Sequence, residues 1–525
     1  MGAASLVAAS SVTASQRVAA VDQYAGHVAG PIDGYLAAYN EFPEPEPRMD
    51  LRRARGAGLF VRDGRNYLMT VGHTATLKGW YVHDYGRWET LGRVSHTTYR
   101  LKNGQWSDEP PRIALVDTQR TDIAPLVRIA PGEKNITIDT ENGPVTLPPV
   151  APVSRVATPD SARRGGTVCF SKLDGAYSYR CGEIVTWNPC QQDLGCLMTS
   201  KDGSALVAGG DSGSYVWRPL ADGTVEFQGI LDRSLAGDGF YQPAWRFTET
   251  DWKPDQTAPG HPTGKGGRIV TVPSPPNDLA VSTERGKTRI SWSPSTEDAA
   301  DPVTGYQVFR GSRKIAELGR EARSFEDPKG DIAAPTDFRV VAVDKWGVQR
   351  TARLTDQARG STYTTSPERY VDGYGEPAGC DDAARGCGLL TNGAWDPNST
   401  EDTGKEPSPF HGGWLGFHPW RTDQRGDIRI SVDLGKPTRI STISSHWLRA
   451  EGTATYYPRT VRYEVSADGR TWKDAGTASP SGGDPSAAWL SIAVSSEQPV
   501  RHIRLTAEAQ QAYFFTMADE IIAAG

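Results

Sequence analysis

Residues 209–214 read GGDSGS, a glycine-rich turn that carries Ser212. Earlier in the chain, TVGHT follows a β-like run and carries His73, and TDIAPLV opens another such run and carries Asp122. Acyl transfer needs a hydroxyl nucleophile, an imidazole that takes its proton and a carboxylate that orients the imidazole. His73, Asp122 and Ser212 supply these groups, so the pattern predicts an acyl-transfer site.

The spacing of the three groups fits two β-barrels that meet at a shared interface. His73 and Asp122 are 49 residues apart, and Asp122 and Ser212 are 90 apart, long enough for each barrel to contribute to the interface. Short β-rich runs with turn residues between them fill residues 57–247, and Asp63-Gly64 predicts a hairpin. We therefore expect an all-β domain over 51–247.

The three phrases resemble those of a known enzyme family. TVGHT is similar to the TAGHC of trypsin-like serine proteases, TDIAPLV to their DIALL and GGDSGS to their GDSGG. GTVCFSKLDGAYSYRCGEI at 166–184 resembles the disulfide-closed hairpin of secreted streptogrisin-like bacterial proteases. The resemblance implies a chymotrypsin-like double β-barrel, with His73 as general base, Asp122 as its orienting carboxylate and Ser212 as nucleophile.

The same resemblance implies an oxyanion hole and a specificity pocket. The main-chain N–H groups of Gly210 and Ser212 would stabilise the developing negative charge. Leu206 stands six residues before the serine, where trypsin-like enzymes carry Asp, which argues against a preference for basic side chains. QGILDRSLAG resembles the pocket wall and places Asp232 and Arg233 there, so a charged or polar pocket stays open.

Other assignments of the same residues are weaker. An α/β-hydrolase site would need glycine where Ser214 stands, and its histidine would come last in the chain. Asp117 is a rival carboxylate, but it lacks the Ile-Ala continuation and is expected to cap or end a strand. We expect His83 and His96 to be surface or loop histidines.

The six cysteines favour disulfides and an oxidising, extracellular compartment. A zinc site is less favoured, because no pair has a two-residue ligand spacing and no histidine lies close by. Catalysis is expected to need no cofactor. The expected disulfides join Cys169 with Cys181, Cys190 with Cys196, and Cys380 with Cys387.

The length of 525 residues predicts several domains. The net charge of −6 gives no basic surface for nucleic acid, and no apolar run is long enough to span a membrane. The acidic, proline-rich EFPEPEP and the Pro/Gly-rich stretch after the first domain are typical of linkers. The expected division is an N-terminal segment 1–50 (signal remnant or propeptide, and linker), the protease-like domain 51–247, a linker 248–272, a domain 273–355, a linker 356–369 and a domain 370–525.

The last two domains resemble modules of extracellular proteins. The β-runs of 273–355 have the spacing of a seven-strand sandwich and resemble a fibronectin type III domain, which implies a spacer. SVDLGKPTRIS, YEVSADGRTW and ADEI within 370–525 look like a discoidin (coagulation factor type C) domain, a galactose-binding-like jelly roll. The second resemblance implies a targeting module for a glycan or another cell-surface ligand.

Two ligand sites are expected in the discoidin-like domain. By resemblance, Asn392, Asp396 and Glu520 supply oxygen ligands for a structural Ca²⁺ ion. Aromatic rings beside imidazoles suit the C–H faces and hydroxyls of sugars, although core packing is the commoner fate of tryptophan. The residues expected to include the sugar contacts are His418, Trp420, His446 and Trp447.

The sequence supports two functions of different classes. The first is a secreted serine endopeptidase that acts on a protein or peptide substrate. The alternative is a carbohydrate-binding or adhesion protein with a degenerate protease domain, because Thr74, Phe170 and Ser214 depart from the family pattern. An intact hydrogen bond between Ser212 and His73 would distinguish the enzyme.

Overall fold

The computed structural model divides the chain into two compact units. The N-terminal unit comprises Met1–Pro273 with Glu297–Pro302 and Asp344–Val348, and the C-terminal unit comprises the remainder. The structure describes residues 28–30, 32–37, 52–73, 79–84, 87–102, 105–108, 110–118, 123–130, 134–173, 177–185, 190–191, 195–208, 211–254, 260–284, 287–296, 302–329, 333–366, 389–395, 414–417, 427–450, 454–480, 487–495, 498–510 and 515–525.

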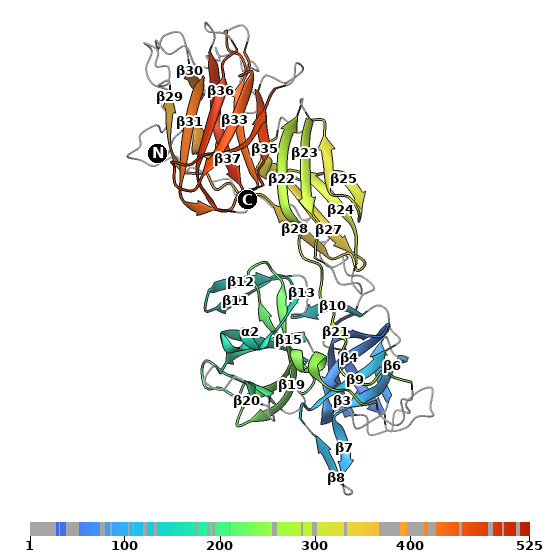
Figure 1. Ribbon diagram of the computed structural model, residues 1–525. Helices are drawn as coiled ribbons and strands as arrows, with labels where there is room; N and C mark the ends of the chain where they lie inside the picture. Colours follow the sequence, from blue (N-terminus) through green and yellow to red (C-terminus); the bar gives the residue numbers. More distant parts are fainter. Residues whose placement is uncertain are drawn as a thin grey trace, which may run out of the picture. The chain divides into compact units, whose positions relative to one another are not determined.

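The first barrel of the N-terminal unit is a closed ring of six described strands. Figure 1 labels four of them, β3, β4, β6 and β9, which lie side by side. The ring closes because its first strand also pairs with its last, and a short seventh strand extends it. In order around the ring the strands are β2 (Ile32–Ala37), β5 (Gly79–Asp84), β6 (Arg87–Thr97), β9 (Ile113–Thr118), β4 (Arg65–Val71) and β3 (Arg52–Arg62), followed by β21 (Arg268–Ile269).

The second barrel is also a closed ring, formed within a ten-stranded sheet. Its strands are β19 (Val225–Leu235), β18 (Tyr215–Pro219), β14 (Thr167–Leu173), β15 (Tyr177–Ile184), β17 (Gly195–Thr199) and β20 (Asp238–Pro243), which pairs back to β19. The same sheet continues through β13 (Val150–Val156), β10 (Ile123–Arg128) and β1 (Val28–Gly30), and through β16 (Cys190–Gln191).

Segment 1–50 contributes structure to both sheets. Its strand β1 pairs in parallel with β10, and β2 pairs with β3 and β5. Segment 1–50 therefore supplies one described strand to each of the two sheets. The remaining elements of the unit are β7 (Tyr99–Lys102), β8 (Gln105–Asp108), β11 (Ile136–Thr140), β12 (Gly143–Leu147), α2 (Pro159–Arg163) and α3 (Trp245–Glu249).

The C-terminal unit holds two β-sandwiches. The first has a sheet of β22 (Asn277–Glu284), β23 (Lys287–Ser293) and β26 (Ser324–Asp327), facing one of β25 (Arg313–Gly319), β24 (Val303–Arg310), β27 (Phe338–Asp344) and β28 (Gln349–Arg353). The second has β29 (Thr362–Ser366), β31 (Ile428–Thr438), β36 (Val500–Glu508), β33 (Thr460–Ser466) and β34 (Lys473–Ala478), with β30 (Leu415–Phe417), β37 (Thr516–Ala524), β32 (Thr442–Leu448) and β35 (Ala487–Ala493). The C-terminal unit also contains two short 3-10 turns, η3 (Pro335–Asp337) and η4 (Leu389–Thr391).

Alternating side chains build the first sandwich, and its core continues into the second. In β23 the buried side chains are Thr288, Ile290 and Trp292, two residues apart, as expected for a strand with one face inward. Trp489 and Ile522 of the jelly roll belong to the same apolar cluster. The all-β fold class, with double barrel, sandwich and jelly roll, is therefore confirmed.

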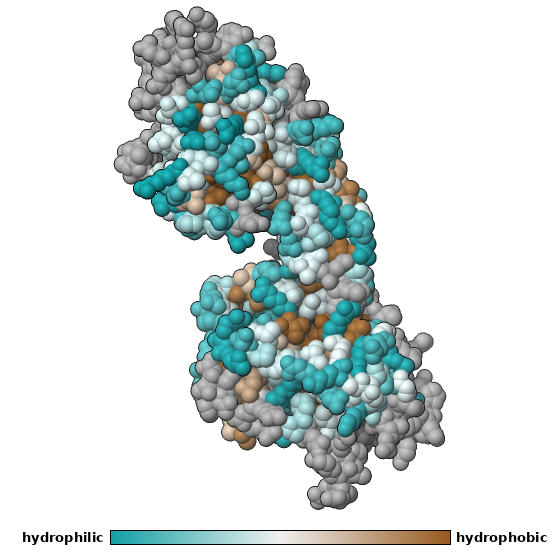
Figure 2. Space-filling model, in the orientation of Figure 1, coloured by the Kyte–Doolittle hydropathy of each residue, from teal (hydrophilic) through white to brown (hydrophobic). Residues whose placement is uncertain are grey.

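The described surface is largely polar. Figure 2 shows hydrophilic and intermediate residues over most of the visible face of each unit, with smaller hydrophobic areas. Leu235, at 62% exposure, is the one exposed large hydrophobic side chain among the described residues. Within that same part of the chain, no helix has the length and hydrophobicity that a membrane span requires.

Candidate functional site

Ser212 lies in a tight turn that leads into β18. The turn is closed by the Ser214 N–H, which donates to the Asp211 carbonyl at 3.1 Å, and Gly213 adopts φ +86°. The Gly213 N–H donates to the Leu231 carbonyl at 2.7 Å, so the turn is anchored to β19. A left-handed φ costs glycine little, which explains the glycine after the serine.

His73 lies just beyond the end of β4 in the first barrel. The preceding Gly72 N–H donates to the Arg112 carbonyl at 2.9 Å, which continues the β4–β9 pairing by one residue. The His73 side chain is 39% exposed. The imidazole is thus held by the barrel main chain and remains accessible to a substrate.

Asp232 of the second barrel contacts both Ser212 and His73. The Ser212 hydroxyl donates to the main-chain carbonyl of Asp232 at 2.9 Å, and the Asp232 Oδ1 lies 3.4 Å from the His73 Nδ1. The Asp232 carboxylate is completely buried. Because a hydroxyl has one proton, the Ser212 Oγ does not donate to His73 in this state, which differs from the hydrogen bond expected of the enzyme.

Other side chains hold the second carboxylate oxygen of Asp232. Its Oδ2 accepts from the Gln242 Nε2 at 2.8 Å and lies 3.2 Å from the Arg233 Nε and 3.9 Å from the Arg112 Nη1. Gln242 is buried, and its Oε1 accepts from the Arg246 Nη1 at 2.8 Å. Two hydrogen-bond donors, Gln242 and Arg233, and the nearby Arg112 guanidinium therefore offset the burial of this charge.

The structure places the three residues expected in the specificity pocket in different surroundings. Asp232 faces His73 and lies at an irregularity in the β19–β20 pairing, between Leu231 and Arg233. Leu206 is 4% exposed and belongs to the core of the second barrel. Of the three pocket residues, Arg233 alone is substantially exposed, at 35% of its side chain.

Several expected site residues lie outside the described residues: Asp122, which immediately precedes β10, Gly210 of the oxyanion hole, and Thr74. Asp211 is buried, and its Oδ2 accepts from the Ala208 N–H at 2.9 Å. The described part of the site therefore consists of His73, Ser212 and Asp232.

The rival carboxylate and the two other histidines considered from the sequence lie elsewhere in the first barrel. Asp117 is in β9 and pairs with Arg65 at 3.3 Å and with the His261 Nε2 at 3.4 Å. His96 lies in β6 and is completely buried, so the expectation of a surface or loop histidine is wrong for it. Burial lowers the pKa of His96 to about 4. His83 lies within β5.

Two of the three expected disulfides are confirmed. Cys169 joins Cys181 across the paired strands β14 and β15, and Cys190 joins Cys196 across β16 and β17. Cys380 and Cys387 lie outside the described residues.

The expected calcium site is partly described. Glu520 is buried; its Oε2 accepts from the Gly393 N–H at 2.8 Å, while its Oε1 has no hydrogen-bond partner among the described residues. Burial raises the pKa of Glu520 to about 9, and the nearby Asp356 carboxylate adds to the increase. A buried oxygen without a partner beside a second carboxylate fits a hard cation.

Other parts of that site argue less directly for a metal. The Asn392 Oδ1 accepts from the Ala394 N–H at 2.7 Å, and Asp396 lies outside the described residues. Within the described ranges, no group of three His, Cys, Asp or Glu side chains could hold a metal ion. Any cation here would therefore also need main-chain oxygens or Asp396.

The proposed sugar contacts are not all at the surface. His446 and Trp447 are buried, because every residue of β32 is covered on both faces of its sheet. The His446 Nδ1 pairs with the Asp519 Oδ1 at 2.7 Å, and the ring stacks on Trp489. Neither side chain is available to stack on a sugar, so of the four candidates only the other two can be sugar contacts. His418 and Trp420 lie outside the described residues.

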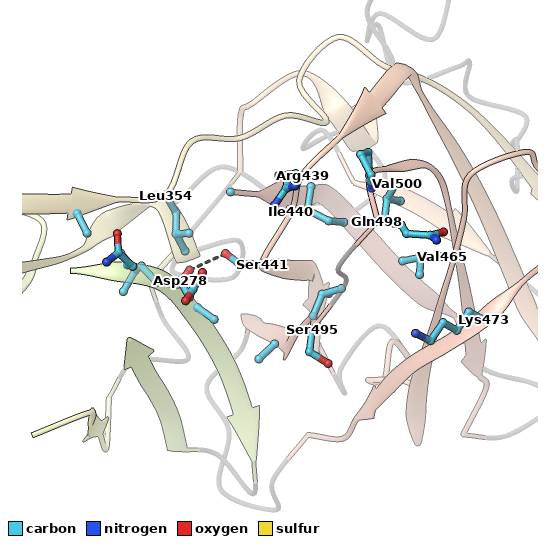
Figure 3. Close-up of a pocket in the computed structure, with 18 of the residues that line it drawn as sticks. Asp278, Leu354, Arg439, Ile440, Ser441, Val465, Lys473, Ser495, Gln498 and Val500 are labelled. Carbon is cyan, nitrogen blue, oxygen red and sulfur yellow. Dashed lines mark hydrogen bonds between the residues drawn. The ribbon is translucent and has the colours of Figure 1, made fainter. Parts of the chain in front are cut away.

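A groove of about 1820 Å³ lies between the two sandwiches of the C-terminal unit (Figure 3). The Ser441 hydroxyl donates to the Leu279 carbonyl at 2.5 Å beside it, and the Val281 N–H donates to the Thr442 Oγ1 at 2.8 Å. Its lining mixes Arg439 and Lys473 with apolar and acidic residues. The groove belongs to a junction at which side-chain hydroxyls of the jelly roll are hydrogen-bonded to the main chain of the first sandwich.

Comparisons with known proteins found similar solved structures and one family model that matches part of the chain. No curated protein matches the chain. Similar solved structures include two from Clostridium perfringens: CpGH89CBM32-4 with GlcNAc-α-1,4-galactose (11% identity, 33% of this chain and 96% of that chain, TM-score 0.20) and CpGH89CBM32-5 with GalNAc-β-1,3-galactose (15%, 32% and 98%, TM-score 0.22). A Ruminococcus gnavus GH29 fucosidase in complex with fucose is also similar (17%, 32% of this chain, 26% of that chain, TM-score 0.19).

One family model matches a part of the chain near its C-terminal end. The F5/8 type C domain family matches residues 391–521. These residues include β30 to β36 and most of β37, which are eight of the nine described strands of the jelly roll; β29 precedes the match. The C-terminal unit of this chain therefore contains an F5/8 type C domain.

Proposed function

We propose that the protein is a secreted, modular protein that binds a carbohydrate through its F5/8 type C domain and hydrolyses peptide bonds at Ser212. The two roles have different support. The family match to residues 391–521 supports the binding role, whereas the hydrolytic role rests on the geometry around Ser212 alone. The carbohydrate-binding role is thus the better supported of the two.

The observation that carries the hydrolytic role is the convergence on Asp232. A nucleophile from the second barrel and an imidazole from the first both contact this one residue. In the proposed reaction the Ser212 Oγ rotates from the Asp232 carbonyl towards the substrate and attacks the peptide carbonyl carbon. His73 takes the hydroxyl proton, gives it to the leaving amine and later activates the water that releases the acyl group.

Hydrolysis of an unfolded protein substrate tests this role. We expect slow cleavage by the native chain that is lost in Ser212→Ala and in His73→Ala. Ser234→Ala is the matched control. Ser234 lies in β19, the strand of Asp232, but its hydroxyl donates to the Val207 carbonyl. Cleavage that persists in Ser212→Ala would exclude Ser212 as the nucleophile.

Binding of the full chain to immobilised glycans tests the carbohydrate role. We expect retention that free sugar competes away and that Trp420→Ala weakens. Trp447→Phe is the control, because Trp447 is completely buried in the jelly-roll core. A chain that no glycan retains would contradict the binding role and leave the hydrolytic role standing.

A further inference from the structure

We propose that the Asp232 carboxylate is a positioning group for His73, additional to any contribution from Asp122, and so couples the strand that holds the nucleophile to the general base. This inference rests on the proposed hydrolytic function. It concerns a residue that the sequence placed in the specificity pocket.

The first argument is the direction in which Asp232 points. Asp232 lies between Leu231 and Arg233, where the pairing of β19 with β20 is irregular. Such an irregularity re-aims a side chain that would otherwise follow the alternation of the strand. Here it turns the carboxylate towards the first barrel, where the Oδ1 lies 3.4 Å from the His73 Nδ1.

The second argument is the unequal surroundings of the two carboxylate oxygens. The Oδ2 accepts from the Gln242 Nε2 and lies close to the Arg233 Nε. The Oδ1 is buried and has no hydrogen-bond partner among the described residues. A buried carboxylate oxygen that lacks a donor is costly, and the nearby Nδ1–H is the group placed to satisfy it.

The chemistry of the reaction gives this arrangement a purpose. His73 becomes an imidazolium when it takes the Ser212 proton, and the positive charge then lies against the Asp232 carboxylate. An interaction that strengthens as charge develops lowers the barrier, whereas one of constant strength does not. Hydrogen bonds of this kind are often long before substrate binds, which accounts for a resting separation of 3.4 Å.

The main chain of the same residue links the two groups. The Asp232 carbonyl accepts from the Ser212 Oγ while its carboxylate faces His73. Movement of β19 would therefore shift the nucleophile and the base together. Asp232 does not touch the reacting bond in this arrangement, and it acts through His73.

The test compares isosteric changes at two carboxylates. Asp232→Asn removes the negative charge at His73, and Asp117→Asn does the same beside His261, so the second variant is the matched control. Two quantities are measured: the rate of Ser212 acylation by an activated ester, and the nitrogen-bound proton signal of ¹⁵N-labelled His73, assigned with His73→Gln. Asp232→Ser repeats the test if the asparagine variant does not fold.

We expect Asp232→Asn to slow acylation by about 10²-fold with little change in KM, and to move or remove the His73 proton signal. Asp117→Asn should change neither. A folded Asp232 variant with unchanged rate and unchanged His73 signal would overturn the inference while native acylation upholds the proposed function. If the native chain is not acylated, the proposed function fails, and the His73 signal alone decides whether Asp232 positions the imidazole.

Discussion

The Ser212 hydroxyl donates a hydrogen bond of 2.9 Å to the main-chain carbonyl oxygen of Asp232. In this state the nucleophile is held on the second barrel, and its proton is directed away from His73. The proposed hydrolysis would therefore require rotation of the Ser212 side chain, which a bound substrate could bring about by displacing the Asp232 contact.

The buried amide of Gln242 should stabilise the N-terminal unit. Gln242→Leu removes the 2.8 Å hydrogen bond to the Asp232 Oδ2 and the acceptor for Arg246. We expect the free energy of unfolding to fall by about 2–3 kcal/mol, because the remaining polar groups stay buried. Urea unfolding measures it, with the exposed Gln349→Leu as control. If the free energy of unfolding falls no more than in the control, the hydrogen bonds of Gln242 do not stabilise the unit as predicted.

The stability of the N-terminal unit should depend on the protonation of His96. Its ring nitrogens lie 2.9 Å from the Ser95 Oγ and 2.8 Å from the Pro262 carbonyl, and burial lowers its pKa from 6.5 to about 4. The unfolded chain therefore binds the proton first, so stability falls as the pH drops from 6.5 towards 4.

We expect this loss to reach about 3 kcal/mol at pH 4. Unfolding measured at pH 7.5 and pH 4.5 should show a much smaller pH dependence in His96→Gln. His261 and Asp117 lie close enough to His96 to influence its charge, so each is also changed singly. An equal pH dependence in His96→Gln and the native chain would show that His96 does not cause the effect.

The two described disulfides should differ in their effect on stability. The cysteines of the Cys169–Cys181 bond are 12 residues apart in the sequence, and those of the Cys190–Cys196 bond are 6 apart. Loop-closure entropy assigns about 3 kcal/mol to the first and about 2 kcal/mol to the second. Paired alanine variants, compared by chemical unfolding, should follow this order, and the reverse order would show that local packing outweighs loop length.

Calcium should stabilise the F5/8 type C domain through Glu520. Added Ca²⁺ at about 100 times its Kd is expected to raise the free energy of unfolding by about 2–3 kcal/mol. Glu520→Gln should abolish the increase, whereas Glu508→Gln, whose carboxylate faces the exposed Arg459, should retain it. Equal stabilisation of both variants would place the cation elsewhere.

The local phrases around the site could be predicted from sequence, because each one coincides with the end of a strand. TVGHT ends β4, and the glycine-rich turn leads into β18. Alternation likewise predicts the inward face of β23. These features depend on residues that are close together in the sequence, so a short sequence pattern is enough to predict them.

The role of Asp232 could not be predicted in the same way. Its direction depends on the irregular pairing of β19 with β20, a relation between strands that no local pattern carries. One signal was present: a carboxylate in the apolar run QGILDRSL has to find partners when the strand is buried. His446 and Trp447 could not be recognised as core residues, because β32 is covered on both faces. A strand of that kind lacks the alternation of apolar and polar residues that would distinguish core from surface.

The most direct test of the central claim is labelling with a fluorophosphonate probe, followed by mass spectrometry of the modified peptide. We predict modification at Ser212 in the native chain, retained in Ser234→Ala, lost in Ser212→Ala and strongly slowed in His73→Ala. A folded native chain that carries no label at Ser212 would contradict the claim and leave a carbohydrate-binding protein with inactive barrels.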